Sequence, residues 1–227
     1  MITLLEAIRQ RHSVRSFQDH PLEPSIKEDL VQLVAQCNAK GNLHIQLVTD
    51  EPKAFDCFLS HYGKFSGITN YFALAGKPAP DLDERLGYWG EQLVLRAQQL
   101  GLNTCWVGLT FAKVQGAYTL EAGEKLRLVI ALGYGLSEGK QHKSKRPEQV
   151  SRSLLPSGEA VPEWFQAGVE TALLAPTAVN QQKFLFTLHD DRTVSATAGI
   201  GFFSKVDLGI AKLHFEIGAA PTKVNWR

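Results

Sequence analysis

The sequence has little of several features that would assign it to a common protein class. Its 227 residues include only three cysteines, Cys37, Cys57 and Cys105, which form no CxxC pair and no metal-ligand spacing. No apolar run approaches the roughly 20 residues of a membrane span, and the first residues lack the apolar core of a secretory signal. We therefore expect a cytoplasmic protein with free thiols, no bound metal and no membrane partner, in which Cys105 is a buried, inert thiol.

An excess of one charge sign is also missing. The chain has 24 Lys and Arg against 23 Asp and Glu, a formal net charge of +1. This balance argues against a nucleic-acid-binding protein and means that any anion site must be local. No GxGxxG, GxxxxGK[ST], GxSxG or HExxH motif occurs, so neither a classical dinucleotide fold nor a P-loop is indicated. A hydrophobic fraction of 44% is ordinary for a globular protein with a substantial core.

One short segment concentrates positive charge and hydrogen-bond donors. RHSVRSF, residues 11–17, follows the predicted first helix and places Arg11, His12, Ser13 and Arg15 within five residues. A solvated basic surface and an anion site both fit this pattern. A second basic group, KQHKSKR at residues 140–146, follows a glycine-rich stretch, and its cations could converge on the same anion.

The order of predicted elements suggests that the chain repeats itself. Hydrophobic periodicity predicts helices over residues 2–10, 24–38, 83–101, 161–177 and 206–220, and strands over residues 43–49, 70–76, 103–109, 126–135, 183–189 and 193–199. Pro24 and Asn42 have counterparts at one common offset, Pro162 and Asn180, and the long helices share a glycine, Gly90 and Gly209. These matches predict two divergent copies of one α+β unit, residues 1–150 and 151–227, although chance similarity remains an alternative.

Five segments together resemble the nitroreductase family of flavoproteins: RQRHSVRSF, APTAVNQQ, LVLRAQQLGLNTCWVGL, VIALGYG and KSKRP. The first motif lies in the first copy and the second motif in the second copy. This arrangement resembles the fused branch known as "putative TM nitroreductases", in which one chain folds like a whole dimer. The resemblance implies a nitroreductase-like α+β fold, with mostly antiparallel sheets, packed helices, and two tandem copies that mimic the nitroreductase dimer as one compact unit.

The resemblance also implies a site for flavin mononucleotide (FMN). The first motif would contact the phosphate, ribityl chain and pyrimidine edge through Arg11, His12, Ser13 and Arg15, with Lys64 also at the pyrimidine edge. The backbone of Trp106, Val107 and Gly108 would lie near the ring, and Lys143 and Lys145 would close on the phosphate. The other copy would contact the flavin through Pro176, Thr177, Ala178, Asn180 and Gln182. The sequence departs from the family where Gln182 is followed by Lys183 and Phe184 instead of Pro-Trp, which leaves one pocket wall in doubt.

The activity implied by the resemblance is FMN-dependent oxidation and reduction. NAD(P)H would reduce the cofactor, and a nitroaromatic, quinone or similar small acceptor would then take the electrons in a ping-pong cycle without a catalytic side chain. Because only one junction carries both motifs, we expect one FMN per chain and a protein that can exist as a monomer. Two alternatives stay open: an FMN enzyme of another type, dehalogenase-like or flavin-processing, and a non-catalytic flavin-binding or regulatory module.

Overall fold

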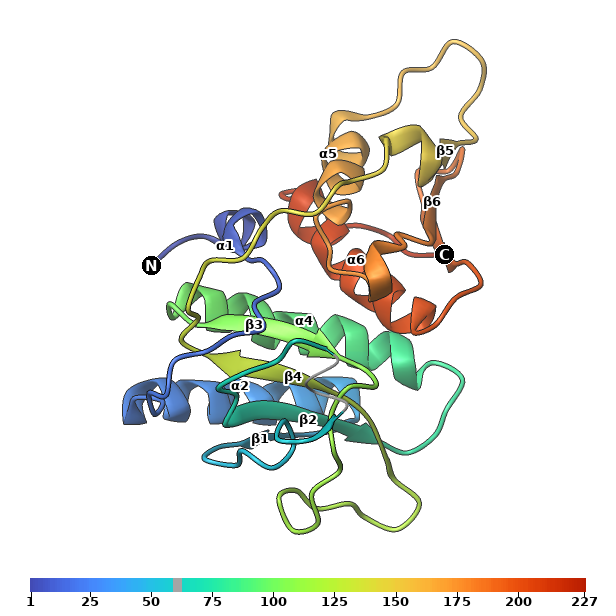
Figure 1. Cartoon of the computed structure of the whole chain (residues 1–227). Coiled ribbons are helices and arrows are strands. Elements are labelled where there is room, and N and C mark those ends of the chain that lie inside the picture. Colours follow the sequence, from blue (N-terminus) through green and yellow to red (C-terminus); the bar gives the residue numbers. More distant parts are fainter. Residues whose placement is uncertain (59–62) are drawn as a thin grey trace.

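The computed structural model describes residues 1–58 and 63–227 and shows two β-sheets with helices packed between them (Figure 1). The first sheet is antiparallel and contains β1 (His44–Val48), β2 (Asn70–Gly76), β4 (Lys125–Gly133) and β3 (Asn103–Val107), in that spatial order. The second contains β5 (Ser151–Ser153), β6 (Phe184–Leu188) and β7 (Val194–Ala198). β5 runs parallel to β6, and β7 runs antiparallel to it.

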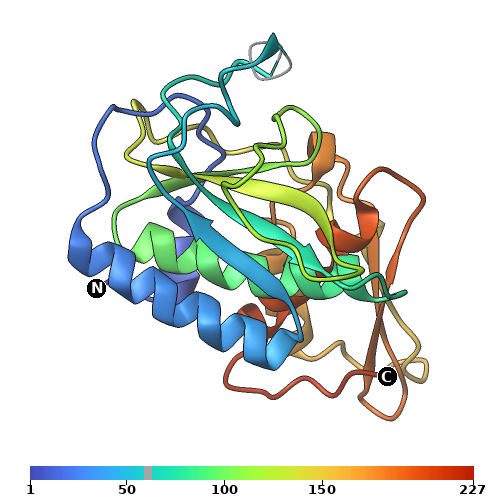
Figure 2. The same ribbon diagram turned by 90° about the horizontal axis from the view of Figure 1, so that it is seen from below.

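Helices cover one face of the first sheet and join it to the second. α2 (Pro24–Gly41) and α4 (Leu82–Gln99) lie side by side on that face (Figure 2). α4 also packs against α6 (Ser204–Ala219), and α6 packs against α5 (Glu163–Ala172) and the second sheet. α1 (Leu4–Gln10) begins with a capping box in which Thr3 and Glu6 exchange hydrogen bonds, and it contacts both α4 and α6.

Glycine allows α4 and α6 to cross at short distance. A Cβ atom at Gly87 would lie 2.1 Å from the carbonyl oxygen of Val206, and one at Gly209 would lie 2.0 Å from that of Glu84. Each helix therefore presents a residue without a side chain to the backbone of the other. Gly90, which the sequence comparison paired with Gly209, instead packs against the Trp106 ring.

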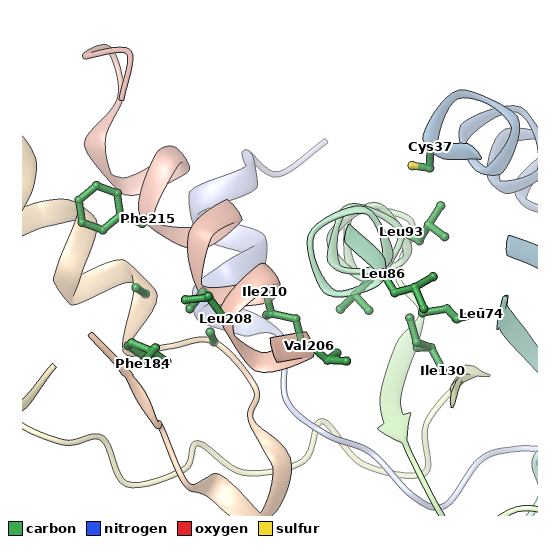
Figure 3. Close-up of a cluster of buried hydrophobic side chains, with 14 of the residues drawn as sticks. Cys37, Leu74, Leu86, Leu93, Ile130, Phe184, Val206, Leu208, Ile210 and Phe215 are labelled. Carbon is green, nitrogen blue, oxygen red and sulfur yellow. The ribbon is translucent and has the colours of Figure 1, made fainter. Parts of the chain in front are cut away.

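Two hydrophobic clusters explain why β2 is buried at every position. Phe72 and Leu74 face the helix side, whereas Tyr71 and Ala73 face a second cluster on the opposite side. A strand buried on both faces does not show the polar alternation of a half-exposed strand. The larger cluster runs from α2 through α4 to α6 and β6, and Figure 3 shows members from each of these elements.

The α+β architecture with two sheets agrees with the sequence prediction. The helix–strand–strand–helix order of α2, β1, β2 and α4 recurs in α5, β6, β7 and α6. Asn42 and Asn180, which the repeat aligned, both adopt left-handed backbone conformations just before a strand, with φ of 47° and 54°. These parallels support the duplication, which remains a prediction. No helix in the described part of the chain is long and apolar enough to cross a bilayer.

Candidate functional site

The segment that follows α1 runs along the edge of β3. Ser13 forms a bridge with Thr104, and the backbone N–H of Val14 donates to the Thr104 carbonyl over 3.0 Å. Val14 and Phe17 enter the second hydrophobic cluster. Because alternate residues of an extended chain face opposite sides, Arg11, Ser13 and Arg15 lie on the side away from Val14, and all three line a cleft there.

The other wall of the cleft is the turn between α5 and β6. Val179, Asn180 and Gln182 have φ of 46°, 54° and 45°, a conformation that costs energy for residues with side chains, and most of all for a β-branched valine. Hydrogen bonds hold the turn in place. The Gln182 N–H donates to the Thr177 hydroxyl, and the Gln182 side-chain amide donates to the Lys143 carbonyl and the Asn180 side-chain oxygen.

Asp207, on α6, holds the same turn in place through two hydrogen bonds. Its carboxylate accepts the Ala178 N–H at 3.0 Å and the Gln181 side-chain amide at 2.7 Å. The side chain is only 3% exposed, and burial raises its pKa to about 6 despite these two bonds. A carboxyl group that titrates near neutral pH therefore lines the cleft.

The cleft consists of two adjoining chambers that share Ser13, Arg15, Pro176, Thr177 and Val179. The basic chamber has a volume of about 500 Å³, and it is also lined by Arg11, His12, Gly139, Lys140, His142 and Asn180. The apolar chamber has a volume of about 140 Å³, and its further lining is Cys105, Trp106, Val107, Gly108, Leu128, Ala178, Phe203, Val206, Asp207 and Ile210. One end thus suits an anion, and the other suits a flat apolar group.

Arg11 is the most unusual charge in the cleft. It is 5% exposed, and its Nε atom has no hydrogen-bond partner among the described residues. Burial lowers the pKa of Arg11, while the nearby Glu91 carboxylate acts in the opposite direction. Burial, and then the charge of Arg11, also lower the pKa of His12. Arg11 is thus a buried guanidinium that lines the basic chamber, and such a group is suited to an anionic ligand.

Most of the residues implied by the resemblance meet in this cleft. They come from three separate segments and are Arg11, His12, Ser13, Arg15, Trp106, Val107, Gly108, Pro176, Thr177, Ala178 and Asn180. Their contacts with a flavin remain predictions. Cys105 is buried as expected, and burial raises its pKa, but its side chain also forms part of the apolar wall.

Four other implied residues do not line either chamber. The Lys145 ammonium donates to the Gln182 carbonyl at 2.8 Å, and its backbone N–H donates to the Gln182 side chain. Lys143 is exposed and contributes its carbonyl to the turn. Gln182 is buried as the link between these two segments, and Lys64 is exposed on a loop next to Phe65. In this structure Lys140 and His142 line the basic chamber in place of the two lysines.

The pattern of the whole chain matches a known family. Residues 3–219 match the family described as "Putative TM nitroreductase". The chain belongs to this family. The assignment to the putative TM nitroreductases, made from the sequence motifs, is therefore confirmed, whereas the fusion of two copies remains a prediction. No curated protein sequence matches this nitroreductase-family chain.

Solved structures show the same fold at low sequence identity. A putative nitroreductase from Thermotoga maritima has a TM-score of 0.62 and 21% identity, over 96% of this chain and 83% of that protein. A putative NADH dehydrogenase/NAD(P)H nitroreductase from Parabacteroides distasonis has a TM-score of 0.52 and 20% identity, over 66% of this chain and 97% of that one. A putative nitroreductase in complex with FMN from Desulfovibrio desulfuricans has a TM-score of 0.51 and 17% identity, over 71% of this chain and 99% of that one.

Proposed function

We propose that this protein is an FMN-dependent oxidoreductase that uses NAD(P)H to reduce a small electron acceptor such as a nitroaromatic or a quinone. The observation that carries the proposal is the cleft itself, in which the buried Arg11 lines a basic chamber that adjoins an apolar one. This polarity matches FMN, which has a phosphate at one end and an apolar ring system at the other. Family membership supports the same assignment.

Different residues would bind the phosphate and the ring of FMN in the two chambers. Arg11, His12 and Lys140 would bind the phosphate in the basic chamber, where burial makes charge-assisted hydrogen bonds strong. Trp106 and Phe203 would bound the ring in the apolar chamber. A Cβ atom at Gly108 would lie 2.4 Å from the Phe203 ring, so glycine there lets Phe203 pack close to the end of β3.

When bound, FMN would supply the redox chemistry by accepting a hydride from NAD(P)H and passing electrons to the acceptor. Arg15 lines both chambers, and its guanidinium lies 5.9 Å from the centre of the Phe65 ring. A fixed positive charge at this point would stabilise negative charge on the ring system. No side chain is assigned as an obligatory acid or base, because solvent can deliver protons to an open pocket.

The cleft combines segments from both halves of the chain, and among the described residues the corresponding arginines make other contacts. Arg152, near the start of the predicted second copy, donates from Nε to the Thr187 hydroxyl at 2.9 Å within the second sheet. At the junction after α2, Arg85 donates to the carbonyls of Gly41 and Asn42. These contacts support a single FMN per chain and an intramolecular pseudo-dimer that needs no second copy.

The test is reconstitution of the apoprotein with FMN, followed by anaerobic reduction. We expect a yellow protein that bleaches with NADPH or NADH and recovers in air. Arg11→Ala should weaken FMN binding about tenfold to a hundredfold, because a charge-assisted hydrogen bond contributes roughly 1.5–3 kcal/mol. Excess FMN should restore most of the activity.

Arg9→Ala is the matched control, because Arg9 is an exposed arginine on α1 only two residues away and does not line the cleft. It should bind FMN like the wild type. A colourless protein that cannot be reconstituted would remove the flavin assignment. A yellow protein that never bleaches would favour a flavin-binding module. A yellow protein that bleaches but reduces no nitroaromatic or quinone would favour another FMN reaction.

A further inference from the structure

A fully buried carboxylate lies behind the wall of the apolar chamber. Glu91, on α4, accepts the indole N–H of Trp106 at 2.8 Å through one oxygen, and through the other it is 2.9 Å from Nε2 of His214 on α6. Both Glu91 and His214 are 0% exposed. Trp106 belongs to β3 and lines the apolar chamber, so Glu91 connects that wall with both central helices.

The charge of the same carboxylate acts on Arg11. Ala7 and Ile8 of α1 pack with Leu95 and Leu213, which are one turn from Glu91 and next to His214. Arg11 caps the last turn of α1 and is buried at this junction, close enough for the Glu91 charge to act on it. No carboxylate of the described residues forms a direct ion pair with Arg11. Glu91 is thus the buried carboxylate whose charge acts on Arg11, and its oxygens face the Trp106 N–H and the His214 ring.

We propose that Glu91 is a positioning residue that fixes Trp106, balances Arg11, and lowers the midpoint potential of the cofactor held in the cleft. This inference rests on the proposed function. A fixed negative charge behind the wall in a low-dielectric interior opposes any gain of negative charge in front of it. The same charge competes with a ligand phosphate for Arg11, so it weakens anion binding while it stabilises the protein without ligand.

Glu91→Gln tests the charge with little change in shape. The glutamine oxygen can accept the Trp106 N–H, and its amide can donate to His214 once that ring carries its proton on Nδ1, which lies 3.4 Å from the Thr171 carbonyl. We expect the variant to have a higher midpoint potential. A tenfold change in the ratio of the affinities for reduced and oxidised FMN corresponds to about 30 mV for a two-electron couple. Inorganic phosphate should raise the melting temperature of the Glu91→Gln apoprotein more than that of the wild type.

Glu216→Gln is the matched control. Glu216, on α6, also accepts an indole N–H, that of Trp226 at 2.6 Å, and the Tyr88 hydroxyl at 2.6 Å, but Trp226, unlike Trp106, does not line the cleft. The Glu216→Gln substitution should change the stability of the protein. It should leave the midpoint potential, and the rise in melting temperature that phosphate causes, at wild-type values. The inference would be overturned if Glu91→Gln had the same midpoint potential as the wild type. It would also be overturned if Glu91→Gln and Glu216→Gln shifted the midpoint potential equally.

The pairing of Glu91 with Arg11 has its own test in the apoprotein. We expect Arg11→Gln and Glu91→Gln each to destabilise the chain and the double variant to be more stable than the Glu91→Gln single variant, because it leaves no unbalanced charge. If the Glu91→Gln single variant fails to fold and the double variant folds, that result also supports the pairing. Additive losses in urea denaturation would refute the pairing. If wild-type protein binds no FMN, the proposed function fails, whereas the apoprotein comparison still decides the pairing.

Discussion

The stability of this protein should depend on pH through Asp207, and Asp207→Asn should remove that dependence. The carboxyl lies at the start of α6, where it holds the cleft turn through Ala178 and Gln181. Burial raises its pKa from the ordinary 3.8 to about 6. Between these two pH values the folded protein keeps a proton that the unfolded chain has released, so the free energy of unfolding should fall as the pH rises from about 4 to about 6.

The size of the effect follows from the pKa shift. Each pKa unit corresponds to about 1.4 kcal/mol, so a shift of roughly two units amounts to about 3 kcal/mol once the carboxyl is ionised. In Asp207→Asn, the side-chain oxygen can still accept the Ala178 N–H, but its amide meets the Gln181 amide. That mismatch costs about 1 kcal/mol relative to the ionised carboxylate. The change of the stability difference with pH therefore reports the ionisation of Asp207.

Urea denaturation of both apoproteins at several pH values from 4 to 7 measures this difference. From pH 4 to pH 7, the free energy of unfolding of Asp207→Asn should rise relative to that of the wild type by up to about 3 kcal/mol. Asp191→Asn is a useful comparison, because hydrogen bonds from Thr193 lower the pKa of this exposed carboxyl. Its contribution changes only below about pH 4, so the difference between Asp191→Asn and wild type should stay nearly constant from pH 4 to 7. A constant difference between Asp207→Asn and wild type would refute the reasoning.

Three further predictions concern the cofactor and the assembly. Arg15→Ala should lower the midpoint potential and slow reduction at saturating FMN, and Arg15→Lys should restore part of both, as redox titration and stopped-flow absorbance would show. Absorbance after gel filtration should give one FMN per chain, and a ratio near two would contradict the single site. Light scattering should give the mass of one 25.1 kDa chain, and an obligate dimer would contradict the intramolecular pseudo-dimer.

Elements with a strong local pattern could be predicted from the sequence, and elements defined by distant contacts could not. β2 was predicted at Asn70–Gly76, the residues that form it, because a short apolar run between polar segments indicates a buried strand. β5 was missed, since its three residues are polar or exposed and its only partner is β6, more than 30 positions later in the chain. Nothing in SRS itself indicates a strand.

The same distinction applies to the site. The resemblance brought together the segment after α1, the end of β3 and the turn after α5, but it gave no indication of Asp207 or Glu91. In the sequence alone, neither residue differs from an ordinary carboxylate on a helix. One signal was available: Glu91 shares a helix face with Gly87 and Leu95, which are buried. Lys143 and Lys145 were proposed on motif position alone, whereas the turn geometry at Gln182 decides where their side chains lie.

The helix crossing and the cleft should respond to one substitution, because Gly87 contacts the residue that precedes Asp207. A Cβ atom at Gly87 would lie 2.1 Å from the Val206 carbonyl, so Gly87→Ala must push the start of α6 away from α4. Overpacking of this kind costs typically about 1–3 kcal/mol. The same displacement moves Asp207 and the turn that it holds, so FMN affinity should fall together with stability.

Gly218→Ala is the matched control on the same helix. Its Cβ atom would lie 2.2 Å from the Thr171 hydroxyl and 2.6 Å from the Ala167 carbonyl of α5, at the far end of α6 from Asp207. We expect a comparable loss in urea denaturation with FMN affinity close to wild type. If FMN titration showed the same loss of affinity in both variants, general destabilisation would explain it. If only Gly87→Ala lost affinity, the α4–α6 crossing would be what sets the width of the cleft.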